Sequence, residues 1–144
     1  AGEQLDMRRG CVYVVKDTIV AHIIVVDDDD SCRSLLRESL LTRGHTISDF
    51  HCESEALAAY NADPPDLLIT DMVMPGRNGV SLILDVKRNF PDARIIAISG
   101  GDQHAPDNYL RLAKSLGAQR TLLKPFTLEQ LHEAVEEVLP VNKD

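Results

Sequence analysis

Acidic, hydroxyl and ammonium side chains end four short apolar runs of this sequence. The acids at 27 to 30 follow the first run, Asp71 ends the second, and Ser99 and Lys124 end the next two. Carboxylates that gather at about 4 Å repel by roughly 4 kcal/mol per pair at an effective dielectric of ~20, and a shared Mg²⁺ would relieve that repulsion. A carboxylate flanked by a metal ion, an ammonium and a hydroxyl can accept a phosphoryl group, because this transfer needs mainly positioning and charge neutralisation.

The secondary structure decides whether these side chains meet. Apolar and alternating stretches predict five strands, at 23–26, 45–50, 67–70, 94–98 and 121–123. A stretch with helical periodicity follows each strand, so the pattern is typical of an α/β domain in which helices cover both faces of a parallel sheet. The carboxyl ends of parallel strands share one edge, and α/β sheets bind ligands there. We therefore expect Asp71 and the other polar positions to be neighbours.

The ends of the chain are less regular. Residues 1–21 are interpreted as a leader or extension of unassigned structure, in which Val12–Val15 could form an edge strand. We expect one domain over residues 22–140, and a tail or the start of a linker at 141–144. The first helix is expected to be capped by Asp30 or Ser31, because short polar side chains favour that position.

Composition excludes several classes of protein. With 144 residues and 44% hydrophobic residues, the chain suits one globular domain, and no apolar run is long enough for a membrane helix. A net charge of -8 argues against direct binding of nucleic acid. Cys11, Cys32 and Cys52 show no paired ligand spacing, which favours free thiols in the cytoplasm over a disulfide framework or zinc site.

Four spaced motifs resemble the receiver domain of bacterial two-component response regulators. They lie between about Ile23 and Leu139, and read VDD, LITDMVMPG, ISG and LKPF. The resemblance implies a flavodoxin-like (βα)5 fold, a doubly wound parallel sheet with strand order 2-1-3-4-5. It also implies a signalling switch rather than an enzyme, with chemistry limited to its own phosphorylation and dephosphorylation.

The resemblance assigns a role to each candidate metal ligand. Asp28 and Asp71 would bind Mg²⁺ through their carboxylates, Val73 through its backbone carbonyl, and Asp27 through a water molecule.

The remaining roles concern the phosphoryl group. Asp71 would take it from a sensor histidine kinase or a histidine phosphotransfer protein. Ser99 would be the switch hydroxyl, and Lys124 would pair with the phosphoryl oxygens across a cis bond to Pro125. Further partners implied by the resemblance are an output domain or protein, and a second copy bound through the fourth helix, fifth strand and fifth helix.

Two alternative functions stay open at this stage. A magnesium phosphatase or phosphotransferase of the haloacid dehalogenase type also uses a strand-end aspartate, but needs a second Asp where this chain has Val73. The second alternative is a receiver-like binding module that has lost phosphorylation. The presence of Asp28, Asp71, Ser99 and Lys124 argues against it. Thr121 stands where the family usually has an aromatic switch residue, so an aromatic readout is not expected.

We predict slow self-dephosphorylation. Val73 and Gly101 lie two residues past Asp71 and Ser99, and neither has a side chain that could orient an attacking water. The measurement is the loss of the phosphoryl group after the donor is removed. A lifetime of only seconds would contradict this expectation.

Overall fold

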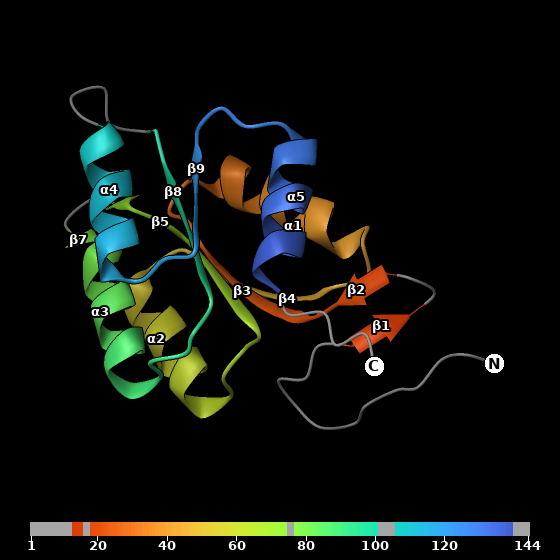
Figure 1. Ribbon diagram of the computed structural model, residues 1–144, viewed down its shortest axis with the longest axis horizontal. Coiled ribbons are helices and arrows are strands. Elements are labelled where there is room, and N and C mark those ends of the chain that lie inside the picture. The colour runs from red at the N-terminus through yellow and green to blue at the C-terminus, as the bar shows by residue number, and fades with distance from the viewer. Residues whose placement is uncertain (1–12, 16–17, 75–76, 101–105, 140–144) are drawn as a thin grey trace.

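A five-stranded parallel sheet forms the centre of the computed structural model, which describes residues 13–15, 18–74, 77–100 and 106–139 (Figure 1). The order across the sheet is β4-β3-β5-β8-β9, which is 2-1-3-4-5 when these five strands are numbered along the chain. The predicted flavodoxin-like order is therefore confirmed. The strands are β3 (His22–Val26), β4 (Thr46–Phe50), β5 (Leu67–Asp71), β8 (Ile95–Ser99) and β9 (Arg120–Leu123).

Helices cover both faces of the sheet. They are α1 (Asp30–Leu41), α2 (Glu53–Ala62), α3 (Gly79–Asn89), α4 (Pro106–Leu116) and α5 (Leu128–Val138). Helices α1 and α5 pack on one face, and α2, α3 and α4 on the other (Figure 1). β5 and β8 are buried along their whole length, as expected for strands covered on both sides. Among the described residues, no helix combines the length and apolar character needed to cross a membrane.

The N-cap of the first helix lies one residue before the nearer of its two predicted positions. Asp29 is the N-cap, and its side chain accepts hydrogen bonds from the backbone N–H groups of Ser31 and Cys32. The prediction of Asp30 or Ser31 was wrong because the cap must have extended backbone, and Asp29 has it, with φ -82° and ψ 111°. Asp30 instead occupies the first helical turn.

The residues before the sheet form a hairpin. β1 (Tyr13–Val15) pairs antiparallel with β2 (Thr18–Val20), so the expected edge strand joins a separate two-stranded sheet. Predictions for residues 1–12 and 140–144 fall outside the described residues. The hairpin is connected to the domain by Ala21, whose N–H donates to His45 Nδ1 at 3.1 Å and whose carbonyl accepts from Thr46 at 3.0 Å.

His45 is a buried acceptor at the amino end of the sheet. Burial lowers the pKa of its imidazole, and the nearby charges of His132 and Arg43 lower it further. A protonated ring would lose the lone pair that accepts from Ala21. The hydrogen bond from Ala21 to His45 therefore requires a neutral imidazole.

We predict that His45 makes the fold sensitive to acid. Its folded pKa is below the unfolded value, so the stability is present above pH ~6.5 and is lost as pH falls through the folded pKa. Urea unfolding at pH 7 and pH 5 should show a smaller pH-dependent loss in His45→Asn, whose amide oxygen can replace Nδ1 as acceptor. His51→Asn, at an exposed histidine that lies 3.9 Å from Glu55, is the comparison variant and should not reduce the loss. Equal losses in wild type and His45→Asn would contradict this role.

Candidate functional site

The polar ends of the strands meet at the carboxyl edge of the sheet, as predicted. Asp71 lies in register with Ile98, and Ser99 lies in register with Leu123 on the next strand. Asp27 follows β3 directly, and its backbone N–H donates to a carbonyl of the neighbouring strand β4. Asp27 and Ser99 are 0% exposed and Asp71 is 3% exposed. Three polar side chains are therefore buried at the carboxyl edge of the sheet.

Lys124 joins two of the acids. Its Nζ donates to Asp71 Oδ2 at 3.0 Å and to Asp27 Oδ2 at 3.1 Å. Burial alone would lower the pKa of this ammonium, but the hydrogen bond and charge of Asp71 and the charge of Asp27 outweigh burial and raise it. Lys124 therefore stays charged across the physiological range. The residues meet as the sequence pattern predicted, although they are up to 97 positions apart.

The three acids form a compact cluster. Asp27, Asp28 and Asp71 each offer a carboxylate oxygen, and these oxygens lie within 4.8 Å of one another. Asp27 is already engaged twice, because Oδ2 accepts from Lys124 and Oδ1 accepts from the N–H of Asp29 at 2.9 Å. Asp28 is exposed to solvent. Such a group of hard oxygen donors, open on one side, has the chemistry that Mg²⁺ prefers.

Ser99 presents an unsatisfied hydroxyl. Its Oγ is buried and has no hydrogen-bond partner within the described residues. A buried polar group left unpaired costs about 1–3 kcal/mol, so folds rarely retain one without a use. The position of Ser99 on β8, beside the strand that carries Asp71, makes its hydroxyl available to a ligand at this edge.

Two glycines permit close packing around the site. Gly100 has φ +145°, and a Cβ there would lie 2.7 Å from the Cβ of Lys124. A Cβ at Gly79 would lie 2.5 Å from the carbonyl oxygen of Asp71. Neither glycine was predicted to be a site residue, although Gly100 ends the ISG motif and Gly79 follows the LITDMVMPG motif by three residues. Because glycine has no side chain, the backbone at Gly100 can lie close to Lys124 and the backbone at Gly79 close to Asp71.

Two residues of α1 contact the acidic loop and were missed as site residues. Arg33 donates to the carbonyl oxygen of Asp27 at 2.8 Å and to Asp49 Oδ2 at 3.1 Å. The spacing of Asp30 and Arg33, three residues apart, could have suggested the ion pair that they form, but not the contact of Arg33 with Asp27. Burial, together with the adjacent Asp27, raises the pKa of the Cys32 thiol to about 12. Cys32 is therefore a neutral thiol beside the site.

The other expectations have different outcomes. The Lys124–Pro125 bond is cis, as the resemblance implied. Thr121 lies half-buried in β9. Val73 lies in β6 (Val73–Met74), which pairs with β7 (Arg77–Asn78), and its side chain is outside the described set. Gly101 and most of the loop before α4 also fall outside the described residues.

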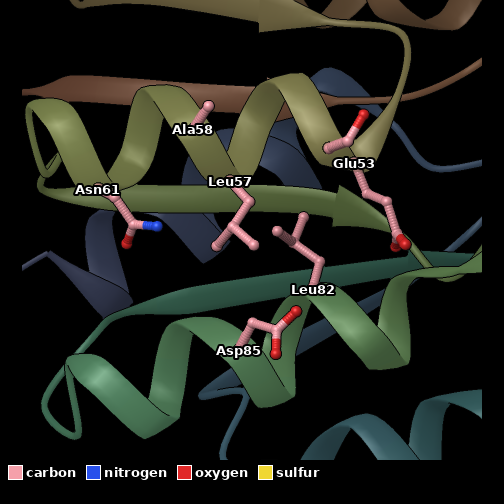
Figure 2. A pocket seen from close by; sticks show the side chains of 7 residues that line it. Glu53, Leu57, Ala58, Asn61, Leu82 and Asp85 are labelled. Carbon is pink, nitrogen blue, oxygen red and sulfur yellow. The ribbon is translucent and has the colours of Figure 1, made fainter.

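A pocket of 250 Å³ lies between α2 and α3, away from these residues (Figure 2). The side chains that line it are Glu53, Ser54, Leu57, Ala58, Asn61, Leu82 and Asp85. It contains none of the predicted site residues, so we place the candidate site at the carboxyl edge instead.

Comparison with known proteins agrees with this geometry. The family model for the response regulator receiver domain matches residues 23–136. The transcriptional regulator NtrC of Azospirillum brasilense is 38% identical over 123 residues, which are 85% of this chain and 25% of that protein. This chain thus spans about a quarter of that relative.

Solved structures share the fold. The receiver domain of NtrX from Brucella abortus has a TM-score of 0.76 and 30% identity, over 81% of this chain and 97% of that one. The beryllofluoride-activated NtrC4 receiver domain dimer has a TM-score of 0.74 and 27% identity, over 82% of this chain and 95% of that one. The chain therefore belongs to the receiver domain family of two-component response regulators, whose members are phosphoryl-accepting signalling switches.

Proposed function

We propose that Asp71 is the phosphoryl acceptor of this receiver domain, and that a histidine kinase or histidine phosphotransfer protein is the donor. The observation that carries the proposal is the contact of Lys124 Nζ with both Asp71 and Asp27. An ammonium beside the nucleophilic carboxylate can bind an incoming phosphoryl oxygen without moving far. The buried hydroxyl of Ser99 supplies a second donor at the same edge.

The acid cluster fits a magnesium ion. We assign its ligands as the carboxylates of Asp28 and Asp71, the backbone carbonyl of Val73, and a water molecule held by Asp27. The indirect role of Asp27 is supported by its two existing hydrogen bonds, from Lys124 and from the backbone of Asp29. When bound, Mg²⁺ neutralises charge on the phosphoryl oxygens and orients them for in-line transfer.

The transfer itself exchanges one bond to phosphorus for another. A carboxylate oxygen of Asp71 forms a P–O bond while the P–N bond to the donor imidazole breaks, and the imidazole nitrogen keeps the electron pair. Lys124 stays protonated because its pKa is raised. Its ammonium can therefore exchange a hydrogen bond to the carboxylate for one to a phosphoryl oxygen. Ser99 Oγ then donates to another phosphoryl oxygen, which satisfies a hydroxyl that has no hydrogen-bond partner among the described residues.

The same contacts connect the site to a binding surface. Ser99 ends β8, and the loop after it leads to α4, while Lys124 follows β9 and precedes α5. Leu112, Leu123 and Leu128 lie on α4, at the end of β9 and on α5, and are 42%, 47% and 48% exposed. We propose this α4–β9–α5 face as the surface that a second copy or an output partner binds in the cytoplasm. The NtrC4 receiver domain, whose activated form is a dimer, supports binding of a second copy.

We predict that Asp71→Asn abolishes phosphorylation. With Mg²⁺ and acetyl phosphate, the wild-type chain should gain one phosphoryl group, detected by intact mass, and the variant should gain none because an amide is not a nucleophile here. Asp92→Asn, at an exposed aspartate after α3, is the matched control and should behave as wild type. Phosphorylation of Asp71→Asn to the wild-type level would show that another residue is the acceptor.

We predict that Lys124→Met destabilises the metal-free protein. It leaves two buried carboxylates without their shared cation, and we expect a loss of roughly 2–3 kcal/mol, below the 3–5 kcal/mol of fully buried pairs because the lysine side chain is 20% exposed. Urea unfolding in a chelator measures this, with the exposed Lys114→Met as control.

The pH dependence gives a second outcome for the same variant. Since the pKa of Lys124 is raised, its stabilisation is fully present below its unfolded value of about 10.4 and is lost only as pH rises through the folded value. The difference between wild type and Lys124→Met should therefore stay constant from pH ~7 to ~10. A difference that vanishes within this interval would contradict the ion-pair account.

A further inference from the structure

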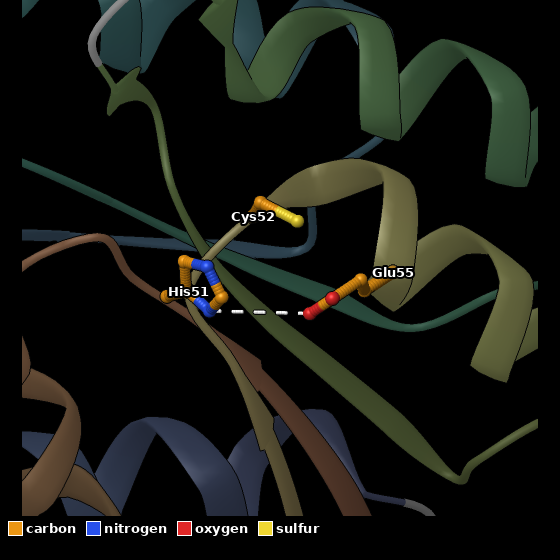
Figure 3. Close-up of side chains that lie close together, drawn as sticks. All are labelled: His51, Cys52 and Glu55. Carbon is orange, nitrogen blue, oxygen red and sulfur yellow. Dashed lines mark ion pairs between the residues drawn. The ribbon is translucent and has the colours of Figure 1, made fainter.

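A second group of ligand-type side chains lies where β4 meets α2. His51, Cys52 and Glu55 each offer one donor atom, and these atoms lie within 4.8 Å of one another. Figure 3 shows the His51 ring facing the Glu55 carboxylate, with an Nδ1 to Oε2 distance of 3.9 Å, and the Cys52 side chain beside them. We propose that these three residues form a zinc-binding site, separate from the acid cluster.

The donor set selects the metal. Imidazole nitrogen, thiolate sulfur and carboxylate oxygen are the three ligand types of protein zinc sites, whereas Mg²⁺ takes oxygen ligands almost alone. A thiolate and a carboxylate together balance the charge of Zn²⁺, and neutral imidazole adds none. Three protein ligands leave a fourth position for water or for a side chain of a partner. The acid cluster, in contrast, has only oxygen donors.

The geometry needs little adjustment. With metal–ligand bonds of about 2.0–2.3 Å and tetrahedral angles, donor atoms lie roughly 3.3–3.7 Å apart, and the present donors are within 4.8 Å. The ligands fall within five consecutive residues, so little chain entropy is lost in bringing them together. The backbone is already held, because Phe50 accepts from Asp27 at 3.1 Å and Cys52 accepts from Ala56 at 3.3 Å.

The position also suits anionic ligands and entry of an ion. Cys52 is the N-cap of α2, and Glu55 lies in the first turn, where the helix dipole favours a carboxylate. The side chains of His51 and Glu55 are 65% and 59% exposed, so an ion can reach them from solvent. Glu53, two residues before Glu55, is buried and lines the pocket of Figure 2 instead. Only one of the two glutamates in this turn is therefore available to the cluster.

The proposed site departs from an expectation of the sequence. The three cysteines show no paired ligand spacing and are expected to be free thiols, but that criterion considers only Cys–Cys and Cys–His spacings. Here a glutamate one helical turn after a His–Cys pair supplies the third ligand. The site begins one residue past Phe50, whose carbonyl contacts Asp27, so both metal sites lie along the same edge of the sheet.

The test uses Co²⁺ as a spectroscopic substitute for Zn²⁺. The full chain, reduced and saturated with Mg²⁺ to occupy the acid cluster, is titrated with Co²⁺. We expect thiolate-to-cobalt charge-transfer absorption in the near ultraviolet that saturates at one ion per chain and is removed by added Zn²⁺. Cys52→Ser should abolish the band. His51→Ala and Glu55→Gln should each raise the half-saturating Co²⁺ concentration by at least about tenfold, since even the loss of a group that only orients a metal ligand costs about 10–100-fold in affinity.

Matched variants separate this site from the other thiols and acids. Cys11→Ser, Cys32→Ser and Glu129→Gln, the last at an exposed glutamate in the first turn of α5, should keep the wild-type titration. No charge-transfer band in the wild-type chain, or a band that survives Cys52→Ser, would overturn the proposal. Phosphorylation of Asp71 is assayed separately, so either result leaves the proposed function untouched.

Discussion

The ammonium of Lys124 is the interaction on which the carboxyl edge depends. It donates to Asp27 and Asp71, two carboxylates that are almost fully buried and would otherwise repel each other. The lysine is held in turn by its backbone, whose N–H donates to the carbonyl of Ser99 at 2.7 Å, and by the closeness that Gly100 allows. The fold therefore retains buried charge at one edge of the sheet, because the ammonium that follows β9 reaches the acids at the ends of β3 and β5.

Much of this arrangement could be predicted from the sequence. Apolar runs that stop at polar residues place the ends of parallel strands, and topology alone then gathers Asp27, Asp71 and Lys124 at one edge. The cap at Asp29 and the contact of Arg33 with Asp27 could not be predicted, because they depend on backbone angles and on packing between elements. Hydrophobic periodicity reports burial and carries little information about either.

The least stable features of the site are those that a phosphoryl group would relieve. Within the part of the chain that the structure describes, Ser99 has a buried hydroxyl without a partner, and the acids crowd within 4.8 Å. Both cost stability in the free protein, and both would be satisfied by a metal ion and an added anion. In the proposed switch, threonine at position 121 provides no aromatic readout, so the response is expected to reach α4 and α5 from Ser99 and Lys124. The exposed leucines on those elements lie where such a response would be detected by a partner.

The most direct test of this account is a crystal structure of the chain with Mg²⁺ and beryllofluoride, a stable mimic of the phosphoryl group. The account predicts the beryllium bonded to a carboxylate oxygen of Asp71, with Lys124 Nζ and Ser99 Oγ each donating to a fluoride. Mg²⁺ would contact Asp28 and Asp71. A structure in which Lys124 remains on Asp27 and contacts no fluoride, or in which the mimic binds elsewhere, would contradict the central role of this lysine.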